Sequence, residues 1–274
     1  MYDLHTHSQI SDGTQPVREL VADVAATGLT GFALTDHDTT AGWAEAELEA
    51  GRLGLDFLPG MEISCSAQGV SIHLLSYLHD PANEALLAEI NRARDSRVGR
   101  AQRMVERLAE DYPITWETVQ NQVHEGATVG RPHIADALVT LGAVANRSEA
   151  FETILTTRSK YYVPHYAVDP VRAVELVRAA GGVPVMAHPK ASARGKLASD
   201  ETIYAMIEVG LAGFEVYHRD NPEEDRTWLL ETAAKHDLLV TGSSDYHGTG
   251  KPNRLGENTT PRETVERIRD LARR

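Results

Sequence analysis

The chain repeats one pattern of apolar and polar positions, in which an amphipathic helix, a small-residue turn and a short apolar strand lead into polar residues. The segment 16–27 has apolar residues at helical spacing, and Gly28, the apolar strand 31–34 and polar residues 35–38 follow it. The pattern recurs with helices at 170–180, 201–209 and 222–236 and strands at 183–187, 213–216 and 238–241. Strands that alternate with helices of this length predict βα units and a parallel sheet.

Residues 81–164 break this pattern. A long helical stretch rich in Ala, Leu, Glu and Arg covers 83–110, and shorter helices are predicted at 131–141 and 148–156, with no strand pattern among them. We therefore expect residues 81–164 to form a helical insertion that covers the substrate pocket. Residues 1–80 and 165–274 then form one βα domain, which ends in an amphipathic helix at 261–274.

Composition narrows the classes of function. The 274 residues carry a formal net charge of -13, which argues against binding along an extended nucleic acid. Bound divalent ions would still make one pocket locally positive. The chain has no basic leader and no run of eighteen apolar residues, so we expect a cytoplasmic protein that does not enter a membrane. The single cysteine, Cys65, excludes an internal disulfide and a thiolate zinc site, and it is expected to be a packed residue.

Histidine and carboxylate side chains gather where predicted strands end. His5 and His7 share one face of a strand because the side-chain period of a strand is two, and Asp245 with His247 repeats this spacing. Further polar residues of this kind follow other strands, or lie in the strand 70–78: His37, Glu62, His73, His188 and His218.

Each of these residues alone has an ordinary structural explanation, such as a turn histidine or an exposed carboxylate. Together they predict a ligand cluster on one rim, which favours a closed βα barrel over an open doubly wound sheet. Imidazole and carboxylate ligands suit Mn, Fe(II) or Zn better than Ca.

The arrangement of these motifs resembles the PHP (polymerase and histidinol phosphatase) superfamily. The matching motifs occur in the order His5-Thr6-His7-Ser8, Ser11-Asp12-Gly13, Thr35-Asp36-His37-Asp38, Gly60-Met61-Glu62-Ile63, Ala187-His188-Pro189 and Ser244-Asp245-Tyr246-His247. The segment Gly130–Ala135 further resembles the stand-alone members that act on nucleotides. The resemblance implies a distorted seven-stranded βα (TIM-like) barrel.

The resemblance also implies two or three divalent ions. One would take His5, His7, Glu62 and Asp245, and a second would take Glu62 as a bridging ligand with His73 and His188. A third would take Asp12, His37 and His247. Some members have histidine where this chain has Asp12, which leaves the metal and the occupancy of the third site open.

Such a centre implies hydrolysis by a metal-activated hydroxide, which needs no serine or cysteine nucleophile. His218 is a candidate catalytic proton donor, or else supports a ligand through a hydrogen bond. Arg131 and His133 are candidate substrate-binding residues, with Arg131 also catalytic, although the same residues are suited to begin a helix. His79, His124, His165 and His236 have no assigned role, and most are expected at the surface.

The function predicted from these observations is hydrolysis of the phosphomonoester of a small nucleotide. The candidate substrates are a nucleoside 3',5'-bisphosphate, AMP and the end of a short oligoribonucleotide. Histidinol phosphate is an alternative substrate, and a non-catalytic metal-binding regulatory domain is an alternative from a different class. The sequence leaves the native metal and the oligomeric state open.

Overall fold

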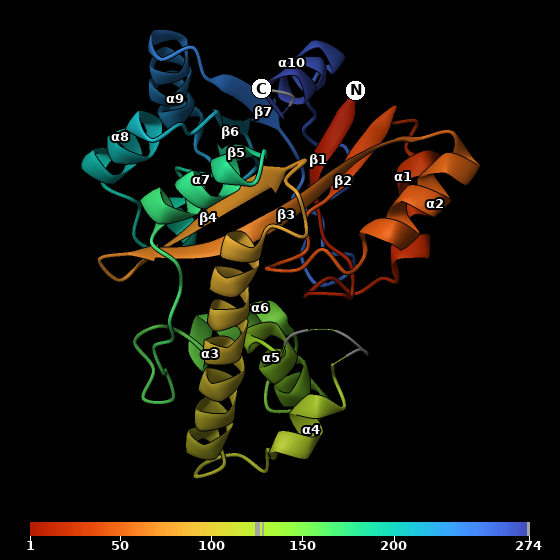
Figure 1. The fold of residues 1–274 in the computed structure, drawn as a ribbon. Helices are drawn as coiled ribbons and strands as arrows, with labels where there is room; N and C mark the ends of the chain where they lie inside the picture. Colours follow the sequence, from red (N-terminus) through yellow and green to blue (C-terminus); the bar gives the residue numbers. More distant parts are fainter. Residues whose placement is uncertain (124–126, 128, 273–274) are drawn as a thin grey trace.

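The structure is a computed structural model that describes residues 1–123, 127 and 129–272. In this part of the chain one seven-stranded sheet curves nearly into a barrel (Figure 1). Its strands are β1 (Tyr2–Thr6), β2 (Gly31–Leu34), β3 (Asp56–Ala67), β4 (Val70–Tyr77), β5 (Val183–Met186), β6 (Gly213–Tyr217) and β7 (Leu239–Gly242). The edge strands approach each other where the backbone N–H of His7 donates to the carbonyl of Tyr246 at 2.8 Å.

The strands follow one another around the sheet in chain order, but they are not all parallel. β4 runs antiparallel to both β3 and β5, whereas the other neighbouring pairs are parallel. The prediction of a parallel sheet is therefore wrong for β4. The reason is local: residues Gln68 and Gly69 both have positive φ, and they turn the chain tightly from β3 into β4 without a crossover helix.

Helices surround the sheet, and most lie within a few residues of their predicted bounds. In the described residues they are α1 (Val17–Ala26), α2 (Trp43–Leu53), α3 (Glu84–Leu108), α4 (Trp116–Gln120), α5 (Arg131–Thr140), α6 (Arg147–Thr153), α7 (Pro170–Ala179), α8 (Asp200–Glu208), α9 (Glu223–Lys235) and α10 (Arg262–Ala272), with a short 3₁₀ turn at Ser192–Arg194. The repeated pattern did not predict α2, which ends at Gly54 in the left-handed region with φ 69°.

Apolar side chains fill the inside of the barrel. Leu4, Leu58, Leu75, Val185 and Leu239 come from five different strands and are buried in one cluster. Residues of α10 extend the same cluster, and α10 lies beside the N-terminus at one end of the barrel (Figure 1). The barrel is therefore a packed core, and polar chemistry is confined to its opposite rim.

The helices α3 to α6 lie between β4 and β5 in the chain and extend from that opposite end of the barrel (Figure 1). They pack around an apolar cluster of their own, which includes Met104, Leu108, Leu138 and Leu155. α3 is shared between the two parts, because Leu86 and Ile90 near its start pack into the cluster around β3 and β4.

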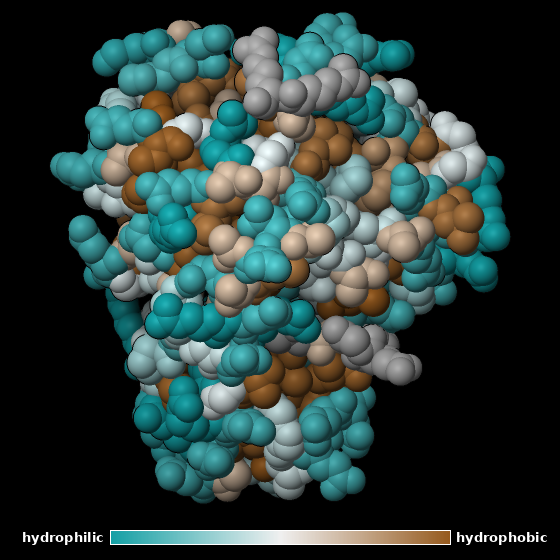
Figure 2. All heavy atoms as spheres, in the orientation of Figure 1, coloured by the Kyte–Doolittle hydropathy of each residue, from teal (hydrophilic) through white to brown (hydrophobic). Residues whose placement is uncertain are grey.

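Hydrophilic side chains cover most of the face in Figure 2, and hydrophobic residues form separate patches on it. Among the described residues, no helix has the length and apolar character needed to span a bilayer.

Candidate metal centre

The carboxylate of Glu62 lies at the middle of the polar rim and is almost fully buried. Its Oε2 atom lies 3.1–3.2 Å from the Nε2 atoms of His5, His7 and His37. Its Oε1 atom lies 2.6 Å from Nδ1 of His73 and 3.4 Å from Nε2 of His188. One carboxylate is thus surrounded by imidazoles from β1, β4 and the loops after β2 and β5.

Asp245 and Asp12 place further carboxylate oxygens around the same imidazoles. Oδ1 of Asp245 lies 3.4 Å from Nε2 of both His5 and His7. Oδ1 of Asp12 lies 3.2 Å from Nε2 of His247, and its Oδ2 lies 3.8 Å from Nε2 of His37. The nine predicted ligands therefore lie together, although they come from positions 5 to 247.

Within the described residues, ligand atoms form three overlapping groups that are compact enough to hold ions. The members are His5, His7, Glu62 and Asp245 in one group, His7, Asp12, His37 and His247 in another, and His37, Glu62 and His73 in the third. The first group equals the predicted first ligand set. In the third group His37 stands beside Glu62 and His73, where the prediction has His188.

Unpartnered buried atoms test whether these residues fit a metal ion. The Nε2 atoms of His5, His7, His188 and His247, with Oε2 of Glu62, are buried and have no hydrogen-bond partner in the described structure. Leaving such atoms unsatisfied is costly, and cations supply the missing partners. The donor set of imidazole nitrogen and carboxylate oxygen suits Mn, Fe or Zn. The residues fit a cluster of divalent ions.

The groups gathered at the rim shift one another's pKa values. Burial favours a neutral Glu62, but the neighbouring imidazoles of His37, His73 and His5 outweigh it and hold the pKa of Glu62 well below its usual range. Burial lowers the pKa of His37 and of His188 to about 3. Glu62 is therefore ionised, and His37 and His188 are neutral, as metal ligands need to be. Burial lowers the pKa values of His5 and His7, but the surrounding carboxylates raise that of His5 well above its usual range and that of His7 to about 9. A bound metal ion would displace the protons of these two rings.

Unusual backbone conformations set the direction of several of these side chains. His188 and Asp245 have positive φ values of 30° and 55°, and Asp38, which follows His37, has φ 53°. Non-glycine residues seldom adopt this region, and such residues concentrate at functional sites. At Gly13 an added Cβ would lie 2.5 Å from the carbonyl oxygen of His7, so only glycine lets the Asp12 loop approach that close.

Two carboxylates that were not predicted as functional hold the ligands in place. Oε1 of Glu215 lies 2.9 Å from Nδ1 of His5, and its Oε2 accepts the backbone N–H of His188 at 2.8 Å. Asp36 accepts hydrogen bonds from the hydroxyls of Ser8 and Ser11. The sequence signal for Glu215 is a charged residue inside the otherwise apolar strand Gly213–Tyr217. Such outer partners orient a ligand and raise its basicity.

His218 is fully buried beside the ligands. Its Nδ1 accepts the backbone N–H of Asp220 at 3.0 Å, and its Nε2 lies 3.7 Å from Oδ2 of Asp245. Because Nδ1 serves as an acceptor, the proton of the neutral ring is assigned to Nε2, which points towards Asp245. Oδ2 of Asp245 also accepts hydrogen bonds from Nη2 of Arg194 at 2.6 Å and from Nζ of Lys251 at 3.0 Å.

Arg131 and His133 lie in the first turn of α5, and neither belongs to the three ligand groups found among the described residues. Nδ1 of His133 accepts the backbone N–H of Gly130 at 3.1 Å, and its ring is buried. Nη1 of Arg131 lies 3.4 Å from the carbonyl of Leu155. Of the four histidines without an assigned role, His79 is 3% exposed and contacts Ser76, so it is not one of those at the surface. His124 lies outside the described residues.

Comparisons with known proteins agree with the barrel fold and with the candidate metal centre. The PHP domain model matches residues 3–163, which is more than half of the chain. The chain is 33% identical to a 3',5'-nucleoside bisphosphate phosphatase of Chromobacterium violaceum, over 92% of this chain and 89% of that protein. It is 31% identical to a 5'-3' exoribonuclease of Haemophilus influenzae, over 94% and 93% of the two chains.

Solved structures extend the similarity. A Bifidobacterium adolescentis protein assigned as a metal-dependent phosphoesterase superposes with a TM-score of 0.96 and 48% identity, over 98% of this chain and 96% of that one. The fold and the site define a metal-dependent phosphoesterase, a hydrolase of phosphoester bonds. The chain belongs to the PHP family.

Proposed function

We propose that this phosphoesterase hydrolyses the phosphomonoester of a small nucleotide: a nucleoside 3',5'-bisphosphate, AMP or the end of a short oligoribonucleotide. The observation that carries the hydrolytic part is the convergence of buried, unpartnered imidazole nitrogens on Glu62. The nucleotide part is supported by full-length similarity to a bisphosphate phosphatase and to an exoribonuclease. A similar fold from Chromobacterium violaceum, 32% identical, holds sulfate, which has the shape and charge of a phosphate group.

The nine rim ligands would hold two or three ions of Mn, Fe or Zn. Glu62 would bridge two of them, and Asp12, His37 and His247 would hold the third. Ions of this kind acidify water and stabilise negative charge on phosphoryl oxygens. Glu215 and Asp36 keep the ligand loops in position for this task.

His218 is proposed as the proton donor for the leaving oxygen. As water attacks phosphorus and the P–O ester bond breaks, the nucleoside oxygen gains a negative charge and needs a proton. Among the described residues, Nε2 of His218 is buried beside Asp245 and has no acceptor within hydrogen-bonding distance, so its proton is available to the leaving oxygen. The proton that the attacking water loses would then restore the ring. The products are an alcohol and inorganic phosphate.

Residues 81–164 are proposed as the insertion that covers the substrate pocket, with Arg131 as a substrate contact. Nδ1 of His133 accepts the backbone N–H of Gly130, so any contact of His133 with substrate would use Nε2.

The proposal is tested by phosphate release from adenosine 3',5'-bisphosphate, AMP, a short 5'-phosphorylated RNA and histidinol phosphate, with metal content determined on the same preparation. We expect at least two ions per chain and turnover of the nucleotides. Release from histidinol phosphate alone would overturn the nucleotide assignment. Fewer than two ions and no turnover after Mn addition would overturn the hydrolytic one.

A further inference from the structure

One arginine of the helical insertion reaches the loop that carries the proposed ligand Asp12. Arg147 is the first residue of α6, and most of its side chain is buried. Its Nη1 donates to the backbone carbonyl of Asp12 at 2.8 Å, although the two residues are 135 positions apart in the chain. The insertion therefore contacts the metal rim directly at one of the proposed ligand loops.

The guanidinium of Arg147 is held on its other edge by Asp136 of α5. Its Nε and Nη2 donate to the two carboxylate oxygens of Asp136, each at 2.5 Å. A bidentate pair of this kind fixes both the plane and the direction of a guanidinium. Nη1 is the nitrogen that does not take part in this pair, and it is directed at the carbonyl of Asp12. Arg147 thus joins α5, α6 and the Asp12 loop in one hydrogen-bonded unit.

The loop that follows the proposed ligand His247 packs against the same guanidinium. At Gly250 an added Cβ would lie 2.5 Å from Nη1 of Arg147, so the lack of a side chain gives the loop room to pass. The carbonyl of His247 accepts the backbone N–H of Gly250 at 3.3 Å and that of Thr14 at 3.2 Å. Thr14 lies two residues after Asp12. The loops of two proposed ligands of the third ion therefore meet beside Arg147.

Arg147 bonds to the backbone of Asp12 and leaves the carboxylate to the imidazoles. Oδ1 of Asp12 lies 3.2 Å from Nε2 of His247, and Oδ2 lies 3.8 Å from Nε2 of His37. A guanidinium that paired with this carboxylate would compete with a bound cation for its oxygens. Because Asp136 pairs with Arg147 and fixes its direction, the guanidinium can orient Asp12 without occupying the oxygens that would bind the ion.

We propose that Arg147 is a positioning residue for the third ion, and that this ion site is complete only when the helical insertion is docked on the barrel. The ion is the one that Asp12, His37 and His247 would hold. The inference rests on the proposed function only through this ion, and it does not depend on the substrate. Because coupling between two binding events is reciprocal, the third ion should in turn hold α5 and α6 against the rim.

The experiment measures Mn²⁺ binding to the metal-free protein by equilibrium dialysis, without substrate. We expect the wild type to bind three ions and Asp12→Asn to bind two, which identifies the third ion. In Arg147→Met, which keeps an apolar stem but no donor, the affinity for that same ion should fall about 10- to 100-fold, as for loss of a group that orients a ligand. The other two ions should bind as in the wild type. Arg158→Met is the matched control, because Arg158 is an exposed arginine shortly after α6.

The double variant Asp12→Asn/Arg147→Met separates positioning from general stability. If Arg147 acts through Asp12, its replacement should not change Mn²⁺ binding further once Asp12 has been replaced. Equal weakening of all ions in Arg147→Met, or weaker binding of the two remaining ions in the double variant, would assign a purely structural role and overturn the proposal. If thermal unfolding shows that Arg147→Met is misfolded, Asp136→Asn replaces it, because it frees the guanidinium and should weaken the same ion.

Hydrogen exchange with and without Mn²⁺ tests the docking of the insertion. In the wild type Mn²⁺ should slow exchange in α5 and α6 more than it does in Asp12→Asn, and Arg147→Met should lose this difference. Equal slowing in wild type and Asp12→Asn would overturn the coupling.

These measurements separate the inference from the proposed function. Three ions coupled to the insertion in a protein that hydrolyses none of the nucleotides would support the inference and overturn the function. Only two ions in an active wild type would overturn the inference and leave the hydrolase standing.

Discussion

Nδ1 of His73 lies 2.6 Å from Oε1 of Glu62, although the two residues are on strands that run in opposite directions. Glu62 lies in β3, and the tight turn at Gln68 and Gly69 brings β4 back along it. His73 therefore reaches the rim from within a strand, while the other imidazoles reach it from the ends of parallel strands. The reversal places two proposed ligands of one ion on the neighbouring strands of one hairpin.

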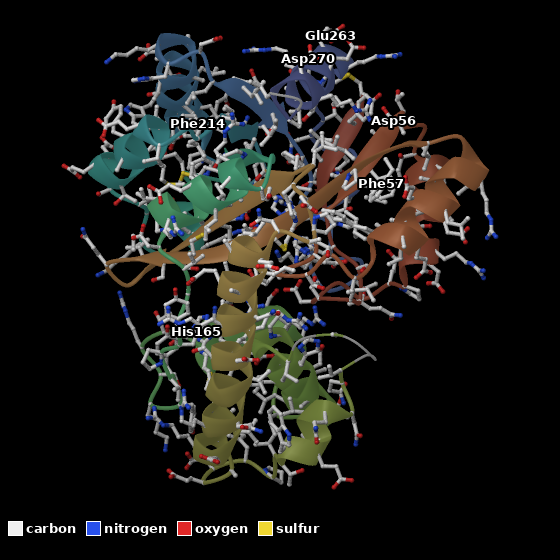
Figure 3. The ribbon with its side chains drawn as sticks, in the orientation of Figure 1. Asp56, Phe57, His165, Phe214, Glu263 and Asp270 are labelled. Atoms are coloured by element: carbon white, nitrogen blue, oxygen red, sulfur yellow. The ribbon has the colours of Figure 1, made fainter. Side chains whose placement is uncertain are left out.

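Replacement of Glu62 is expected to remove the proposed bridging ligand and so to weaken metal binding and turnover. Glu62→Gln keeps the size of the side chain but removes the negative charge that the surrounding imidazoles stabilise. Loss of a residue that only hydrogen-bonds to a metal ligand lowers metal affinity or activity about 10- to 100-fold. For the proposed ligand Glu62 itself we therefore expect turnover to fall at least about 100-fold, with fewer ions bound. Elemental analysis and phosphate release check this. Glu263→Gln is the control, because Glu263 is exposed on α10 (Figure 3). Near-normal turnover in Glu62→Gln would disprove the bridging role.

Glu215→Gln is expected to weaken metal binding without changing a proposed ligand. Glu215 holds Nδ1 of His5 and the backbone of His188, so its loss leaves both rings less well oriented. We expect apparent metal affinity to fall about 10- to 100-fold in chelator-buffered titrations. Glu231→Gln, exposed on α9, should bind metal as the wild type does. Unchanged affinity in Glu215→Gln would mean that the rim orients His5 by packing alone.

His218→Asn is expected to slow turnover most where the leaving group is basic. For a nucleoside leaving oxygen we expect kcat to fall about 10²- to 10⁴-fold, the usual contribution of a positioned proton donor. For p-nitrophenyl phosphate, whose leaving group needs no proton, the fall should be much smaller. Metal content should not change. An equal fall for both substrates would assign His218 to ligand support instead.

Buried His79 is expected to make stability depend on pH. Burial lowers its pKa in the folded state to about 4, against 6.5 when it is exposed by unfolding. The unfolded chain therefore binds more protons between these values, so stability is complete above pH 6.5 and falls as pH decreases to 4. The shift corresponds to about 3 kcal/mol at most.

Denaturant unfolding of wild type and His79→Asn over this pH range measures the effect. Their difference in unfolding free energy should change with pH only between 6.5 and 4, because the other titrating groups are common to both proteins. A pH-independent difference would show that His79 is not the group responsible.

The sequence by itself determined the βα repeat, the helical segment between its halves, and the residue types at the rim. It did so because helix and strand periodicity, glycine turns and His-x-His spacing are local properties of the chain. The likeness of the rim motifs to one family was also present in the sequence, since each motif is a short stretch of neighbouring residues.

Only the tertiary structure decided the reversed direction of β4 and the support of His5 by Glu215. These features depend on contacts between residues tens to hundreds of positions apart, and on a turn at Gln68 and Gly69 whose geometry the apolar pattern does not encode. The sequence specifies which groups are available, and the packing of distant segments specifies which of them meet.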